Sequence, residues 1–247
     1  MKKSSVPVKF ISTVPGLSGI KDLNPRLSKE YVPSWWKEMP HGSKESGSSH
    51  VFETKTAKMC PALPDMFSQG YVLPMWVDTV ITFDKNTGFW SWRTANPKQF
   101  DLEIHPPNQF LEHVSEGVSF QGSLTSFVFK ALCPWRLITP PGYSVLQLPL
   151  FYHFKKEFSV LPGSIRTDIH HEINQQILYH GEGKEVFIRR GEPFVQYIPY
   201  KRLQAELMIS DMSLEEEIMF KTNDLDLFTS FDGNYLRKKR QQDIKNK

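Results

Sequence analysis

Short apolar runs that alternate with turn residues fill the middle of the chain. Residues 71–83 are apolar and β-branched, 89–94 alternate between apolar and polar, and the turn at 85–88 between them indicates a hairpin. Similar runs, each bounded by Gly, Pro or a polar turn, recur at 117–120, 126–132, 135–138, 144–150, 172–179, 185–188 and 194–199. This spacing predicts an all-β fold, either a barrel or a sandwich.

Helical signals precede this region. Residues 20–40 have a partly helical apolar spacing that Pro25 and Pro33 interrupt, so we expect short helices joined by turns. Residues 61–70 begin with a proline and end with a glycine, which is typical of one short helix.

A further helix is predicted near the C-terminus, over about 213–231. Ser213 and Glu216 form an S-x-x-E capping box at its start. We therefore expect three parts, which are an N-terminal extension with short helices packed on the core (1–70), a barrel of β-strands (71–210), and a C-terminal helix with a basic tail (211–247).

The composition is that of a folded protein with a nearly neutral body. Charged residues make up only 23% of the 247 residues and aromatic residues 13%, which favours a folded core over disorder. Much of the net charge of +3 lies near the C-terminus, so the rest of the chain is close to neutral and lacks the excess of basic residues that is typical of nucleic-acid-binding domains. The sequence leaves open whether a nucleic acid is a partner. Two cysteines cannot build a disulfide framework, and no apolar run suits a signal peptide or a membrane span. We expect a soluble protein of a reducing compartment.

Four short motifs follow one another between about Leu132 and Leu207. They are a strand, turn and strand at 134–143, a strand at 144–151, the run P-G-S-I-R-T-D at 162–168 and the run I-R-R-G-E-P-F-V-Q-Y at 188–197. In order and spacing they resemble the core of the homotrimeric dUTPase and dCTP deaminase family, in which the second motif leads to P-R-S-G and the third and fourth read G-x-I-D-x-D-Y and basic-G-D-R-I-A-Q. The resemblance implies a dUTPase-like β-clip barrel and a homo-oligomer such as the family's trimer.

The positions that perform the family's chemistry read differently here. Arg166 occupies the position of the aspartate that activates water and cannot accept a proton, and Ile169 occupies that of the pyrimidine-binding tyrosine. Residues 149–152 read Pro-Leu-Phe-Tyr where the family holds phosphates, and the tail over 231–247 has one glycine, so no phosphate-cradling loop is expected. The resemblance thus predicts the fold without dUTP hydrolysis.

Two other runs of residues indicate the kind of genome that encodes the protein. Residues 33–37 and 60–71 resemble a protein family of tailed phages, particularly phages of marine hosts. This resemblance implies a viral protein, which we expect in the cytoplasm of the infected host cell or in the virion.

Asp168, His170 and Glu172 are the candidate catalytic residues. Because they alternate, they would share one face of a strand and could replace the missing base. With His153 or His180 they could instead form the two-His, one-carboxylate site of a cupin-like oxygenase. The glycine-framed H-x-H of cupins is absent, so a polar strand face without metal or cofactor is the favoured interpretation.

Arg166, Arg189, Arg190 and Gln196 are candidates for binding an anion, such as a nucleotide or a phosphate. The motifs that hold the arginines converge in the family's subunit-interface site, and guanidinium groups suit phosphate. In the alternative interpretation the arginines form surface ion pairs with Glu172, Glu185 and Glu192.

Three functions are compatible with these patterns. A non-catalytic binding or assembly protein is the first hypothesis, because the scaffold motifs are kept and the base is lost. A divergent nucleotide-processing enzyme that uses the same inter-strand pocket is the second, and a metal-dependent cupin-like oxygenase is the third. The sequence has no P-loop, Rossmann fingerprint, nucleophile elbow or zinc motif.

Overall fold

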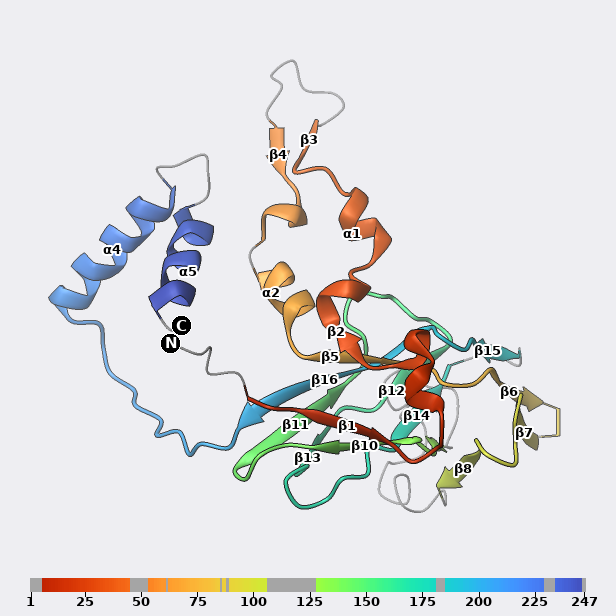
Figure 1. The fold of residues 1–247 in the computed structure, drawn as a ribbon. Coiled ribbons are helices and arrows are strands. Elements are labelled where there is room, and N and C mark those ends of the chain that lie inside the picture. Colours follow the sequence, from red (N-terminus) through yellow and green to blue (C-terminus); the bar gives the residue numbers. More distant parts are fainter. Residues whose placement is uncertain are drawn as a thin grey trace. The chain divides into compact units, whose positions relative to one another are not determined.

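The computed structural model describes residues 6–44, 53–60, 62–84, 86–87, 89–105, 128–180, 185–228 and 234–245 (Figure 1). Strands predominate among these residues and pair antiparallel, so the predicted all-β class is confirmed. The described strands belong to separate sheets of two to five strands, and they do not close into one barrel.

The chain divides into two compact units. The core unit comprises Pro7–Glu38 and Met66–Arg202. The second unit comprises Met1–Val6, Met39–Asp65 and Leu203–Lys247. The predicted site residues all belong to the core unit.

The largest sheet has five strands, with the nine-residue β16 (Pro193–Lys201) at its centre. β11 (Tyr143–Leu148) and β5 (Tyr71–Pro74) pair with its two sides, and β13 (Gly163–Ile165) and β2 (Arg26–Leu27) form the edges. Long β-branched and aromatic runs thus supply the central strands, as expected for residues that are buried on a pleated surface.

The other strands form smaller sheets. A four-stranded sheet contains β12 (Phe158–Val160), β14 (Gln175–Tyr179), β9 (Val128–Ala131) and β8 (Leu102–His105). A three-stranded sheet contains β15 (Val186–Ile188), β6 (Thr79–Asp84) and β7 (Phe89–Thr94). Two further sheets have two strands each, one with β1 (Lys9–Ser12) and β10 (Trp135–Ile138), the other with β3 (Gly42–Lys44) and β4 (Glu53–Lys55). β6 and β7 form a hairpin around the predicted turn, but the predicted first run, 71–83, is divided between β5 and β6, which belong to different sheets. The predicted run at 117–120 lies outside the described residues.

The first 70 residues contain short helices, as predicted. They are η1 (Leu17–Gly19), η2 (Lys21–Leu23), η3 (Ser28–Tyr31), α1 (Ser34–Glu38), η4 (Ala57–Met59) and α2 (Ala62–Ser68). α4 (Leu214–Phe228) begins at the predicted capping box, in which the Ser213 backbone N–H donates to Glu216 Oε2 at 2.8 Å. The basic tail contains another helix, α5 (Asn234–Lys245). Among the described residues no helix is both long and apolar enough to cross a membrane.

One polar group ties three strands together inside the apolar core. Tyr197 on β16 is fully buried, and burial raises the pKa of its hydroxyl well above the ordinary value. The hydroxyl lies 3.1 Å from Gln147 Oε1 on β11 and accepts a hydrogen bond from Gln175 Nε2 on β14 at 2.5 Å. Because buried polar groups need partners, this network fixes how the two sheets pack.

Candidate functional site

Asp168 lies in a turn, so the prediction that it shares a strand face with its neighbours is wrong. Arg202 Nη1 donates to Asp168 Oδ1 at 2.9 Å, Arg202 Nη2 bonds Oδ2, and the Gly142 backbone N–H donates to Oδ2 at 2.9 Å. The hydrogen bonds from Arg202 lower the pKa of Asp168 to about 2. The carboxylate therefore stays ionised and paired, and it is a poor general base at neutral pH.

His170 and Glu172 do lie together. Both line a polar hollow of about 370 Å³, whose other lining residues include Gln147 and Ser164. Glu172 Oε1 accepts a hydrogen bond from Arg136 Nη2 at 2.9 Å, so this carboxylate is already paired. Asp168 does not line this hollow, and the structure therefore brings together two of the three predicted acid and base candidates.

The predicted arginines occupy exposed turns. Arg166 follows β13, and Arg189 and Arg190 follow β15. Arg190 lines a hollow of about 540 Å³ that neither of the others lines, and its backbone N–H donates to Asp78 Oδ1 at 2.7 Å. The Arg189 guanidinium carbon lies 5.2 Å from the ring centre of Phe187. The three side chains therefore do not line one common hollow.

The acids considered as partners for these arginines pair with other cations. Glu172 forms an ion pair with Arg136, and Glu192 forms one with Lys155. Glu185 Oε1 lies 3.5 Å from Arg93 Nη2, which is a third ion pair. No ion pair of the three arginine side chains occurs among the described residues.

Gln196 has a structural partner. Its side chain is buried, and Nε2 donates to the Gln69 backbone oxygen at 2.7 Å. The amide thus bonds backbone from inside the fold. It fastens the chain after α2 to the central strand β16.

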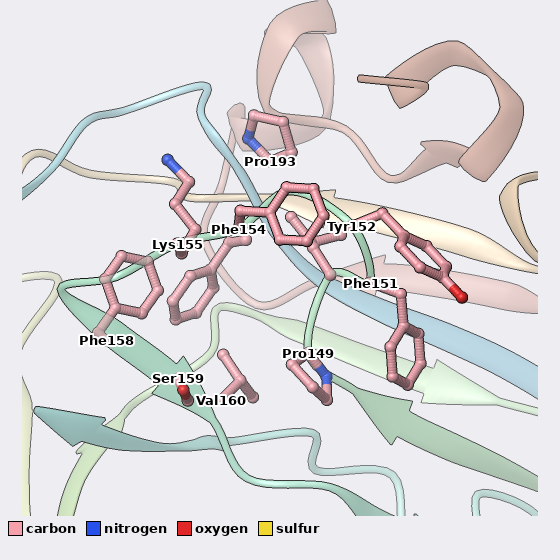
Figure 2. A pocket seen from close by; sticks show the side chains of 11 residues that line it. Pro149, Phe151, Tyr152, Phe154, Lys155, Phe158, Ser159, Val160 and Pro193 are labelled. Carbon is pink, nitrogen blue, oxygen red and sulfur yellow. The ribbon is translucent and has the colours of Figure 1, made fainter. Parts of the chain in front are cut away.

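A third hollow, here called the apolar cleft, has a volume of about 230 Å³ and is lined in part by residues 149–152 (Figure 2). Most of its lining side chains are aromatic or aliphatic, and they come from the β11–β12 loop, from β12 and from the start of β16. The lining consists of Pro149, Leu150, Phe151, Tyr152, Phe154, Lys155, Phe158, Ser159, Val160, Pro193 and Phe194.

The loop that forms one wall of the cleft has two non-glycine residues whose backbone adopts the left-handed conformation, with positive φ. Tyr152 has φ 62° and Phe154 has φ 51°. Such a conformation costs about 1–3 kcal/mol per residue and persists only where the surroundings impose it. Trp35 Nε1 donates to the Tyr152 backbone oxygen at 2.7 Å, and the Trp35 ring lies 5.5 Å from that of Phe154. Left-handed aromatic residues held in this way are typical of functional loops.

Two polar side chains of the cleft, those of Lys155 and Ser159, already have partners. Lys155 is the only cation among the lining residues, and it forms an ion pair with Glu192. Ser159 Oγ lies 2.7 Å from His180 Nε2, and burial lowers the pKa of His180, which favours the neutral ring. The cleft thus offers apolar surface and lacks the free cations that a chain of phosphates requires.

No metal site emerges from the part of the chain that the structure describes. Within it, no three His, Cys, Asp or Glu side chains are placed to hold one ion. Cys133 is buried, which raises the pKa of its thiol to about 12, so this sulfur stays protonated.

Comparisons with known proteins give structural similarities only. No protein-family model and no curated protein matches the chain. The dUTPase of EIAV is similar with a TM-score of 0.33 and 13% identity, over 58% of this chain and 83% of that one. A mutant dUTPase from phage phi11 of S. aureus has a TM-score of 0.27 and 11% identity, over 46% and 99% of the two chains. A mutant dUTPase of Staphylococcus bacteriophage 80alpha has a TM-score of 0.27 and 12% identity, over 46% and 97%. What this chain does must follow from its own residues.

Proposed function

We propose that this chain is a phage protein with a non-catalytic binding or assembly role on a dUTPase-like scaffold. The observation that carries the proposal is the apolar cleft at residues 149–152, where the resembling family holds phosphates. The pairing of Asp168 with Arg202 supports it, because the acid nearest the lost base position is already occupied. We place the protein in the cytoplasm of the infected host cell or in the virion, as a homo-oligomer.

The size and chemistry of the cleft favour a small apolar group. Its volume of about 230 Å³ is below the range of roughly 300–1,000 Å³ that is usual for whole small-molecule sites. An aromatic or aliphatic side chain of a partner protein would fit such a volume and could make edge contacts with Phe158 and Phe194. A nucleoside triphosphate would leave its charged groups without cationic partners.

Two measurements test this proposal. A screen of nucleoside triphosphates with magnesium should release no phosphate or pyrophosphate above background. Saturation-transfer NMR should detect N-acetylphenylalaninamide on the wild-type protein, and Phe154→Ser should weaken this binding at least 10-fold. Phe187→Ser is the matched control, because Phe187 is also an exposed aromatic residue but lies outside the cleft. Nucleotide turnover, or equal binding by both variants, would overturn the proposal.

A divergent nucleotide-processing enzyme is a second candidate, favoured by one observation. His170 and Glu172 line the same polar hollow, which has the volume of an ordinary ligand site at about 370 Å³. Turnover that both His170→Ala and Glu172→Gln abolish would establish this function and displace the first. For a cupin-like oxygenase, the described residues offer no comparable grouping of metal ligands.

A further inference from the structure

Large apolar side chains are concentrated on the surface of residues 203–225. Among the described residues, 18 large hydrophobic side chains are exposed, and ten of these belong to this stretch. Leu207, Met208 and Ile209 in the linker before α4 are 83–86% exposed, and Ile218 on α4 is 58% exposed. We call these ten side chains the C-terminal apolar surface. So many exposed apolar side chains in one short stretch are unusual, because water-soluble monomers rarely leave large apolar patches uncovered.

The local structure does not cover this surface. Residues 203–213 form neither helix nor strand after Arg202, whose guanidinium is fixed by Asp168 and by the Tyr143 backbone oxygen at 2.6 Å. α4 packs against α5, yet Leu214 and Leu225 on α4 remain 71% and 66% exposed. A helical pair of this length obtains most of its stability from burying an apolar face, so this one requires a partner.

The charges of this region indicate what kind of partner fits. Residues 203–228 contain seven acids and one lysine, whereas α5 contains five lysines or arginines and one aspartate. A uniformly basic or uniformly acidic partner would complement only one of these two elements. A second copy of the chain supplies both charges, and a two-fold arrangement can place each acidic α4 beside the basic α5 of the other copy.

The area of the surface is sufficient for a stable dimer. At roughly 100 Å² for each exposed apolar side chain, ten side chains provide about 1,000 Å². A standard interface buries about 800 Å² on each partner.

We infer that residues 203–245 form a self-association element, in which the C-terminal apolar surface and α5 pair with the same segment of a second copy. The pairing is isologous, with the apolar residues of α4 and its preceding linker at the centre and the opposite charges of α4 and α5 at the rim. This element shares no residue with the apolar cleft.

Sedimentation velocity of the full chain between 1 and 100 µM tests this inference. Wild-type protein should form a dimer, and the double substitution Met208→Asp and Ile218→Asp should raise the dissociation constant at least 100-fold. Both side chains are largely exposed in the single chain, so the variant monomer should keep the wild-type circular dichroism spectrum. Raising NaCl from 50 to 500 mM should weaken the dimer, because the paired charges are at the rim.

Leu27→Asp is the matched control. Leu27 is 42% exposed on the edge strand β2 of the core unit, and its substitution should leave the dimer intact. A wild-type monomer throughout this concentration range would overturn the inference and mean that the surface has another occupant. An assembly that the double substitution leaves unchanged, or that Leu27→Asp disrupts equally, would overturn it as well.

Discussion

Gly70 provides a sharp test of how the sheet is built, because it lies where the chain after α2 meets β16. Its φ is +66°, and a Cβ built on it would lie 2.0 Å from the Tyr197 backbone oxygen. Its own carbonyl accepts a hydrogen bond from the Ser28 backbone N–H at 3.1 Å. Gly70→Ala therefore forces two backbone segments apart in the middle of the core unit.

The expected loss of stability has two parts. A left-handed conformation costs an L-residue roughly 1–2 kcal/mol. Overpacking adds about 1–3 kcal/mol, since β16 must shift to restore an ordinary contact. We expect Gly70→Ala to lower the free energy of unfolding by about 2–5 kcal/mol. Gly16→Ala isolates the first part, because Gly16 has φ +80° but a Cβ there would meet no atom within 4 Å.

Urea denaturation monitored by tryptophan fluorescence measures both variants. Gly16→Ala should lose about 1–2 kcal/mol, and the difference between the two variants reports the contact with Tyr197. Equal losses for the two variants would refute the close approach of residue 70 to β16. So would a Gly70→Ala protein as stable as wild type.

Three further outcomes are expected. Tyr197→Phe should lower the free energy of unfolding by about 2–4 kcal/mol, because it leaves the buried side chains of Gln147 and Gln175 each short of a hydrogen-bond partner. Tyr200→Phe, at the surface, should change it by less than about 0.5 kcal/mol in the same urea assay. The difference in urea midpoint between wild type and Asp168→Asn should have its full size above pH 5 and should disappear as the pH falls toward 2, because hydrogen bonds from Arg202 lower the pKa of Asp168 to about 2. A difference that persists at pH 2 would contradict this. Ser213→Ala should reduce α4 stability by about 1 kcal/mol, visible as a loss of helical circular dichroism, and an unchanged spectrum would contradict the capping role.

The elements that the sequence predicted well are those whose signals are local. The β6–β7 hairpin follows from two alternating runs around a turn, and the start of α4 follows from Ser213 and Glu216, which bond each other as the capping box requires. Each signal lies within a few residues along the chain, so tertiary contacts did not override it.

The placement of Asp168 shows where local reasoning fails. Alternation of polar residues suggested a strand, but the backbone N–H groups of Ile169 and His170 both donate to the Arg166 oxygen, at 2.9 and 2.8 Å, and close a turn. Arg202, the partner that fixes the Asp168 carboxylate, is 34 residues away in sequence. A period-two pattern contains no information about a pair at that separation.

The apolar cleft depends on the same kind of long-range information. Left-handed φ angles at Tyr152 and Phe154 could not be predicted, because aromatic residues rarely adopt them and no glycine marks the position. Trp35, which lies 117 residues away in sequence, holds this loop through a hydrogen bond to the Tyr152 backbone oxygen. The sequence did supply one usable signal, which is the apolar Pro-Leu-Phe-Tyr run at 149–152.

The partners of the charged residues limit what these side chains can do for a substrate. Catalysis of phosphate chemistry requires cations and bases that are free to act on a substrate. In this chain Lys155 is paired with Glu192, Glu172 with Arg136, and Asp168 with Arg202, so these groups stabilise the fold's own turns and rims. Phosphate chemistry that used these side chains would require the pairs to open first, whereas binding through apolar surface requires no such rearrangement.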